Sequence, residues 1–358
     1  MRRGVVALVI VATLAVPAAV AAPSGANRNE NAARAIHAYL AMQRYLFDGR
    51  SGSYREAVGK RPGAHAWPIS QAIAAAIAVA QVPDAEPGFA RGARRRIERL
   101  EDLRSGAVYT ASAGGSVYYD DNEWIAQDLL DANAAWPDAA GRQRATEIFE
   151  AVVRAWDSDP SHPCSGGIVW TEAPSNSDRN TVTTANGALL ALRLHALTHR
   201  SRFLHWSQRM LNWLDRCMLA PNGLYWDHID ANGVVDFTHW SYNQGSMIGA
   251  SVLLYRQTHA PSALARAEGL ADATLAYFAG PKLTGEPPEF AAIFFRNLLA
   301  LAAIDHRQQY RDAAQAYADQ AWAQRDARTN LVSFGKPARL LDQAAIVQIY
   351  SALATARP

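Results

Sequence analysis

Two aspartates stand side by side at the start of a helix-like apolar stretch. They are Asp120 and Asp121, within the sequence SVYYDDNEWIAQDLLDA. A single acidic residue is enough to cap a helix and to interact favourably with the positive end of the helix dipole. The second acid lies next to a like charge and among aromatic residues, which a solvated helix start does not require. The local pattern therefore fits either a helix cap or a pair of reacting carboxyl groups.

Paired carboxyl groups carry out glycoside hydrolysis, in which one acts as nucleophile or base and the other as acid. Neighbouring residues at a helix start point about 100° apart around the axis, while their Cα atoms stay about 3.8 Å apart. Both side chains can thus flank one scissile bond. One carboxyl group needs hydrogen bonds to stay ionised, and the other needs a drier site or a charged neighbour to stay protonated. The residues themselves do not show which aspartate has which role.

The elements that must position this pair are helices, because apolar residues recur at helical spacing along almost the whole chain. Helices that are apolar on all sides alternate with helices that have a charged face, which predicts an alternation of buried and outer helices. We therefore expect an all-α fold, an (α/α)6 toroid of six inner and six outer helices. The expected helices are 31–47, 69–81, 89–103, 122–135, 142–156, 181–198, 201–219, 244–257, 261–278, 290–306, 310–325 and 341–354.

Each expected inner helix follows a loop rich in polar and aromatic residues. In a toroid, the N-termini of the inner helices surround one end of the axis, so these loops should converge on one cleft. Binding residues commonly lie on loops that a rigid scaffold holds. The loops are HAWPIS, VYYDDNEW, NSDRNTVTTANG, FTHWSYNQG, EPPEF and GKPARLLDQ.

Aromatic and amide side chains in these loops are candidates for contacts with a sugar. Flat aromatic faces can stack on sugar rings, and amides can bond hydroxyl groups, although such residues can equally belong to the core or cap a helix. The candidates are Trp170, Trp240, Tyr242, Asn180, Asn186, Asn243 and Gln244.

One further cluster, in YWDHID, suggests a metal site at first sight. Asp227, His228 and Asp230 are ligand types, but residues on an extended stretch alternate between its two sides. We therefore expect a solvated turn or hydroxyl contacts here, and no metal. No phosphate-binding loop occurs either, and we expect no cofactor.

Five motifs together resemble glycoside hydrolase family 76, the family of endo-α-1,6-mannanases and related cell-wall mannan enzymes. They run in the family's order and are YYDDNEW, GGIVW, TTANGALLALRLH, SYNQGSMIGASVLLY and FAAIFFRNL. The resemblance implies an (α/α)6 barrel and an endo-acting hydrolase of α-1,6-mannosidic bonds in mannan. It also implies a retaining mechanism with Asp120 as nucleophile and Asp121 as acid/base.

Further substrate contacts are expected around these motifs. They are Tyr119, Asn122 and Trp124 in the aspartate motif, and Glu289 near the family's acidic position. The chain departs from the family where FKGIF is usual, because Ala291 replaces a lysine and Ala292 a glycine. This departure concerns how the tenth expected helix meets the sugar.

The composition fits a neutral partner. Lys plus Arg number 35 and Asp plus Glu 33, a balance that does not suit nucleic acid. The 10 Trp and 13 Tyr residues offer faces for sugar rings. We expect a monomer that binds a neutral polysaccharide or oligosaccharide, α-mannan by the resemblance.

Two other functions would use the same site. A mannan transglycosylase shares the covalent glycosyl-enzyme and differs only in the acceptor. A non-catalytic mannan-binding protein is the third alternative, although a binder has no need of two adjacent acids.

The two cysteines, Cys164 and Cys217, are expected to form a disulfide if the chain is exported. Such a bridge would close a loop of about 54 residues and stabilise the fold by roughly 4 kcal/mol. The alternative is two separate buried thiols.

The N-terminal residues have the features of an export signal. Arg2 and Arg3 precede the apolar run VVALVIVATLAV, and Ala19-Val20-Ala21 follows as a cleavage site. The run is shorter than the about 20 residues that a membrane span needs. We expect a signal peptide at 1–21, a single catalytic domain at 22–358, and a secreted or periplasmic protein.

The signal peptide makes a direct prediction. Mass spectrometry of the exported protein should find an N-terminus near Ala22, because the A-x-A site is cleaved during export. Recovery of the protein only in the cytosol, with Met1 intact, would contradict it.

Overall fold

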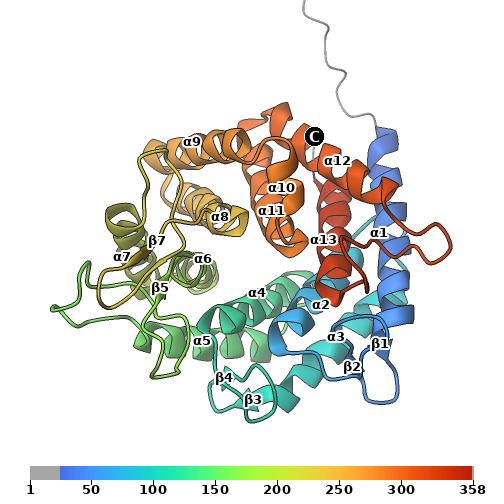
Figure 1. Cartoon of the computed structure of the whole chain (residues 1–358), viewed down its shortest axis with the longest axis horizontal. Helices are drawn as coiled ribbons and strands as arrows, with labels where there is room; N and C mark the ends of the chain where they lie inside the picture. The colour runs from blue at the N-terminus through green and yellow to red at the C-terminus, as the bar shows by residue number, and fades with distance from the viewer. Residues whose placement is uncertain (1–24, 357–358) are drawn as a thin grey trace, which may run out of the picture.

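The computed structural model of the chain describes residues 25–356, which form two concentric rings of helices (Figure 1). The inner ring consists of α2 (Ala66–Val79), α4 (Tyr119–Ala135), α6 (Thr181–Thr198), α8 (Ser241–Thr258), α11 (Pro288–Asp305) and α13 (Leu340–Thr355). The outer ring consists of α1 (Gly25–Leu46), α3 (Pro87–Leu100), α5 (Ala139–Arg154), α7 (Ser201–Cys217), α9 (Pro261–Tyr277) and α12 (Gln308–Ala323). Each inner helix packs on the next, and the ring closes where α13 packs on α2. The predicted all-α toroid is confirmed.

Short elements fill the connections between the helices. They are α10 (Pro281–Gly285), a 3-10 turn (Glu101–Leu103), and the strands β1 (Phe47–Asp48), β2 (Ser53–Tyr54), β3 (Arg104–Ser105), β4 (Val108–Tyr109), β5 (Arg179–Asn180), β6 (His228–Ile229) and β7 (Val235–Asp236). All strand pairs are antiparallel, and β5, β6 and β7 form one small sheet. Among the described residues, no helix is long and apolar enough to cross a membrane.

Several helices begin earlier than the apolar pattern predicts. α4 begins at Tyr119 and α8 at Ser241, three residues before the expected starts. Their first turns, Tyr-Asp-Asp and Ser-Tyr-Asn, are polar or aromatic and carry no apolar period. The aspartate pair therefore lies inside the first helical turn of α4, after the cap residue Tyr118.

Three inner helices end in the same way, on a histidine in the left-handed conformation. His199, His259 and His306 follow α6, α8 and α11 with φ of 55°, 55° and 57°. A residue in this conformation closes a helix and reverses the chain. Only one further residue precedes each following outer helix, so these turns set three inner–outer pairs antiparallel.

A second device recurs at the starts of the inner helices. Asn122 in α4 and Gln244 in α8 each lie four residues after the helix cap and bond the backbone of an extended segment. The Asn122 amide accepts from Tyr109 N at 2.7 Å and donates to Tyr109 O at 2.9 Å. Gln244 makes the same pair of bonds with Tyr225, both at 2.9 Å. These amides therefore clamp the loops on which the helix starts depend.

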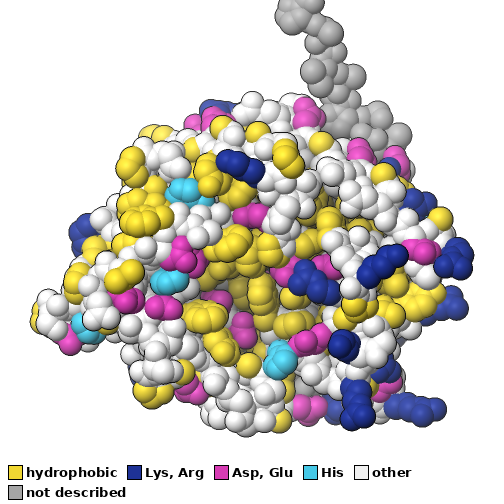
Figure 2. All heavy atoms as spheres, viewed as in Figure 1, with side chains coloured by type: hydrophobic (Ala, Val, Ile, Leu, Met, Phe, Trp, Pro, Cys, Tyr) yellow, Lys and Arg dark blue, Asp and Glu magenta, His cyan; other side chains and the backbone are white. Residues whose placement is uncertain are grey.

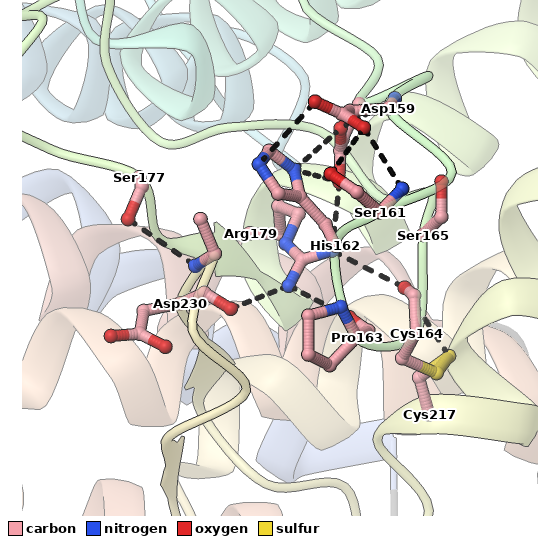
Figure 3. A network of polar contacts seen from close by, with 12 residues as sticks. Asp159, Ser161, His162, Pro163, Cys164, Ser165, Ser177, Arg179, Cys217 and Asp230 are labelled. Carbon is pink, nitrogen blue, oxygen red and sulfur yellow. Dashed lines mark hydrogen bonds and ion pairs between the residues drawn. A yellow bond between two sulfur atoms is a disulfide. The ribbon is translucent and has the colours of Figure 1, made fainter.

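The buried guanidinium of Arg179 holds two loops together (Figure 3). The side chain is 1% exposed and donates to Asp157 Oδ2 at 2.8 Å and to the backbone oxygens of Pro163, Cys164 and Asp230. The loop on one side of it is also tied to the end of α7, because Cys164 and Cys217 form a disulfide.

We predict that Arg179→Leu is strongly destabilising. The change removes the guanidinium that pairs with the buried Asp157 carboxylate and leaves the Pro163 carbonyl oxygen without its hydrogen-bond donor, which costs about 3–5 kcal/mol. Urea denaturation measures the free energy of unfolding. The matched control is Arg202→Leu, whose exposed partner is Glu150 at 2.5 Å, and which should cost less than about 1 kcal/mol. Equal losses in the two variants would contradict the role given to Arg179.

Candidate active site

The start of α4 faces the hollow at the centre of the inner ring. Figure 2 shows this hollow with hydrophobic and acidic side chains on its floor. Burial raises the pKa of the Tyr242 hydroxyl, and the negative charges of Asp227 before β6, Asp120 of α4 and Glu286 after α10 raise it further, so acids from three segments lie close to this one side chain. The loops before the inner helices therefore do converge.

Asp120 is poised to be the carboxylate of the pair. Burial raises its pKa to about 6, and the nearby Asp227 adds to this rise. Hydrogen bonds from the Trp170 indole and from backbone N–H groups of the first helical turn act in the opposite direction, because they stabilise the ionised form. Asp120 thus loses its proton only slightly below neutral pH.

Asp121 is held in the protonated form more strongly. Burial raises its pKa well above the usual value, and the negative charge on Asp120 raises it further. No stabilising hydrogen bond offsets these two effects. Two adjacent carboxyl groups with unequal pKa values are what acid and nucleophile require.

A third carboxyl group, Glu123, lies one turn further along α4 and was not singled out in the sequence. Its side chain is fully buried, and neither carboxyl oxygen has a hydrogen-bond partner among the described residues. Burial and the charge on Asp120 raise its pKa well above normal. The signal in the sequence was its spacing, since residues three apart share a helix face.

Aromatic side chains from three inner-helix starts meet at Phe290. The Tyr242 ring stacks on Phe290 with centroids 4.0 Å apart, and Trp67 and Trp240 lie 6.0 and 5.5 Å from it. Of these, sequence reasoning selected Trp240 and Tyr242 and missed Trp67 and Phe290. Both missed residues lie in the polar and aromatic loops that precede inner helices.

Several buried side chains near the starts of the inner helices have polar atoms without a protein partner in the described part of the chain. Among the described residues, no hydrogen bond reaches Asp120 Oδ1, Asn180 Oδ1, Asn243 Oδ1 or either polar atom of the Asn186 side chain. Asn243 Nδ2 donates to Asp227 Oδ1 at 3.1 Å. These groups come from α4, β5, α6 and α8, and they are the kind that a polyhydroxylated ligand satisfies.

Several expected substrate contacts have other roles in the structure. Asn122 and Gln244 use their amides on the loop backbone, as described above. Trp124 is 2% exposed and packs in a cluster with Val182 and Ile293. These protein partners come from distant segments that the local pattern does not reveal, and contact of the three residues with substrate stays a prediction.

Two more expected contacts also face protein groups. Glu289 is 3% exposed and lies 3.2 Å from Arg339 Nη2, at the start of α13. This ion pair engages one oxygen of its carboxylate, and the contact of Glu289 with the substrate stays a prediction. Tyr119 is half-buried, and the charges that act on its hydroxyl are those of Glu172 and Arg154.

Two further acids, Asp227 and Glu286, act on Tyr242. The imidazole of His228 lies 2.9 Å from Asp227 Oδ2, and this contact, together with Asp178, raises the histidine pKa. Ligand atoms of Asp227, His228 and Asp236 lie within 4.8 Å of one another. Glu286 accepts from Ser241 N at 3.2 Å, and burial raises its pKa to about 7. At neutral pH the hollow therefore carries fewer negative charges than it has acidic side chains, because burial keeps some carboxyl groups protonated.

Solved structures of similar fold support this architecture. The glycoside hydrolase family 76 mannosidase of Bacteroides thetaiotaomicron superposes with a TM-score of 0.80 at 20% identity, covering 91% of this chain and 98% of that one. An inactive variant of the α-1,6-mannanase of a Salegentibacter species, with two consecutive aspartates changed to asparagine, was solved with α-1,6-mannotriose. It superposes with a TM-score of 0.79 at 18% identity, covering 91% and 100%.

Relatives found by sequence match over shorter stretches. Mannan endo-1,6-alpha-mannosidase DCW1 of Candida glabrata is 33% identical over 122 residues, which are 31% of this chain and 26% of that protein. The alignment thus spans about a quarter of the relative's length. The sequence profile of Glycosyl hydrolase family 76, in contrast, matches residues 29–354, and the chain therefore belongs to that family.

Proposed function

We propose that the protein is a retaining, endo-acting hydrolase of α-1,6-mannosidic bonds, with Asp120 as nucleophile and Asp121 as acid/base. The observation that carries the proposal is the pair of adjacent carboxyl groups with pKa values raised to different degrees. Between the two pKa values, Asp120 is ionised while Asp121 keeps its proton. This is the starting state that a retaining mechanism needs.

The first step forms a covalent intermediate. A carboxylate oxygen of Asp120 attacks the anomeric carbon, and the bond from that carbon to the glycosidic oxygen breaks. Asp121 gives its proton to the departing oxygen, so the shortened mannan leaves as an alcohol. The product is a β-linked mannosyl ester of Asp120, and Asp121 is now ionised.

The second step regenerates the enzyme. Asp121 takes a proton from a water molecule, whose oxygen attacks the anomeric carbon and displaces Asp120 as carboxylate. Two inversions restore the α configuration. Ionisation of Asp121 is aided here because Asp120 carries no charge while it is esterified, which removes the repulsion that raised the Asp121 pKa.

The relatives supply the choice of substrate. The sequence relatives are named mannan endo-1,6-alpha-mannosidases, and one structural neighbour was solved with α-1,6-mannotriose. That neighbour is called inactive when two consecutive aspartates are replaced, which supports the roles of Asp120 and Asp121. The aromatic group at Phe290 and the unpartnered amides fit a neutral sugar chain. We expect the active protein outside the cytoplasm, where such a polymer is found.

Replacing each aspartate separately tests the assignment. Asp120→Asn and Asp121→Asn should each lower activity on linear α-1,6-mannan by about 10²–10⁴-fold or more, because each removes one proton-transfer or nucleophilic group. An aryl α-mannoside with a good leaving group needs little protonation. On it, Asp121→Asn should partly recover, and added azide should speed turnover and give the α-mannosyl azide. Product sizing on wild-type digests separates hydrolysis from transglycosylation.

The azide product of the Asp120 variant distinguishes the two assignments. If Asp120 is the nucleophile, azide can attack only directly in Asp120→Asn, and this single inversion gives the β-mannosyl azide. An α-mannosyl azide from Asp120→Asn would mean that the two roles are exchanged. Full activity in both variants would reject the proposal and leave the pair as a helix start.

The raised pKa of Asp120 also makes a stability prediction. A carboxyl group whose folded pKa is raised from 3.8 to about 6 favours folding below its unfolded pKa and loses that contribution as pH rises through about 6. Asp120→Asn removes this loss. The variant should therefore exceed wild type by about 1–3 kcal/mol at pH 7.5 and by much less at pH 4, measured by urea denaturation.

An aspartate with the opposite shift is the control. Hydrogen bonds from Val234 N and Asn232 lower the pKa of Asp230, so its contribution to stability is present above the unfolded pKa and lost in acid. Asp230→Asn should therefore be less stable than wild type at pH 7.5. A uniform, pH-independent change in the Asp120 variant would show that its carboxyl group carries no electrostatic penalty.

A further inference from the structure

A second cavity lies outside the ring, between α7 and the segment 156–166. Its volume is about 590 Å³, and Trp156, Gly166 and Trp213 contribute to its wall. The α7 side of the cavity is an exposed polar stripe at helical spacing. Its members are His205, Gln208, Arg209, Asn212 and Arg216.

Arg209, which lines the cavity, rests on two indole rings, of which Trp156 also lines the cavity. The rings of Trp156 and Trp206 meet edge to face with centroids 5.7 Å apart. The guanidinium of Arg209 lies 4.6 Å from the centre of the first ring and 4.9 Å from that of the second. Cation–π contact with two indoles fixes the orientation of this guanidinium. Its N–H groups therefore form a flat, ordered set of donors at the cavity.

The opposite wall is rigid. Gly166 and Gly167 have φ of 116° and 83°, and a Cβ on either would lie 2.5–2.6 Å from an atom of the Trp213 ring. Trp213 is 1% exposed and donates from its indole to Cys164 O at 2.9 Å. The disulfide and Arg179 hold the same loop from two further sides (Figure 3). Because this loop is already held in place, a ligand that binds here loses little free energy to ordering the loop.

The donors and acceptors of the cavity suit a sugar chain. An α-1,6-linked mannan leaves three neighbouring ring hydroxyls free on each unit, and a guanidinium fork can bond two adjacent oxygens. The exposed amides of Gln208 and Asn212 can both donate and accept, as hydroxyls require. The acid at the cavity, Asp157, is already paired with Arg179.

We propose that this cavity is a second, non-catalytic binding site for the mannan chain. The inference rests on the proposed function, because it takes the polymer that the hollow cleaves as the ligand. A polymer repeats the same unit, so one chain can occupy the cavity and the hollow together. A mannan chain held at the cavity has a higher effective concentration of its glycosidic bonds at the hollow, although the hollow gains no new contact.

The two sites share one segment of the chain. Beyond Gly167 this segment carries Trp170, whose indole bonds Asp120, and Thr171, which pairs with Tyr118 at the start of α4. One side of the segment thus forms the wall of the cavity, and its continuation holds the aspartate pair. The cavity therefore has a fixed position relative to the hollow.

The test uses binding without cleavage. In an Asp120→Asn/Asp121→Asn background, Arg209→Ala/Asn212→Ala should weaken retardation in native gels containing linear α-1,6-mannan by about tenfold or more, because simultaneous binding is lost. Calorimetric binding of α-1,6-mannotetraose at the hollow should stay unchanged. Both altered residues are exposed, so the fold is retained.

A matched control separates this effect from the loss of any arginine. Arg94 lies 5.3 Å over Trp136 at the C-terminal end of α4, and Arg94→Ala should leave polymer binding unchanged. Unchanged retardation in the cavity variant, or equal loss in the Arg94 variant, would overturn the second site. The proposed function is judged separately, by whether the wild type hydrolyses mannan.

Discussion

Repulsion between two neighbouring carboxyl groups is the constraint on which the site depends. Asp120 and Asp121 lie inside one helical turn, with further acids at Glu123 and Asp227. If all were ionised, their mutual repulsion would oppose folding. The protein instead raises the pKa values of Asp120, Asp121 and Glu123 by burial, and Asp121 keeps its proton where the mechanism needs it. Hydrogen bonds favour the charge on Asp120, and nothing comparable favours the charge on Asp121.

The ring of helices keeps these unfavourable groups in place by repeating a few local devices. Amides such as Asn122 and Gln244 fasten an extended segment to each helix start. Left-handed histidines such as His199 reverse the chain at the other end. Arg179 joins the loops that carry Trp170 and Asp227. These contacts stabilise the loops and helix starts around the hollow, and they offset the cost of burying several acids there.

Apolar periodicity was sufficient to predict the toroid, because each helix contributes its own repeat to the signal. It missed the polar first turns of α4 and α8, where the site lies. The aspartate pair stood out because two adjacent acids among aromatics have no simple structural use. The roles of Asn122, Gln244, Trp124 and Glu289 could not be read, because each depends on a partner from a distant segment. Glu123 was hidden because acids are usually exposed on helices.

Placing both reacting groups on consecutive residues has a mechanical consequence. Their separation is set by the geometry of one helical turn, and packing between distant elements does not need to maintain it. The surrounding loops then determine the pKa values and the shape of the hollow. This division explains how the chain can carry Ala291 and Ala292, buried in α11, where the family usually has lysine and glycine. Both positions lie on α11, away from α4, and the spacing of Asp120 and Asp121 depends only on the start of α4.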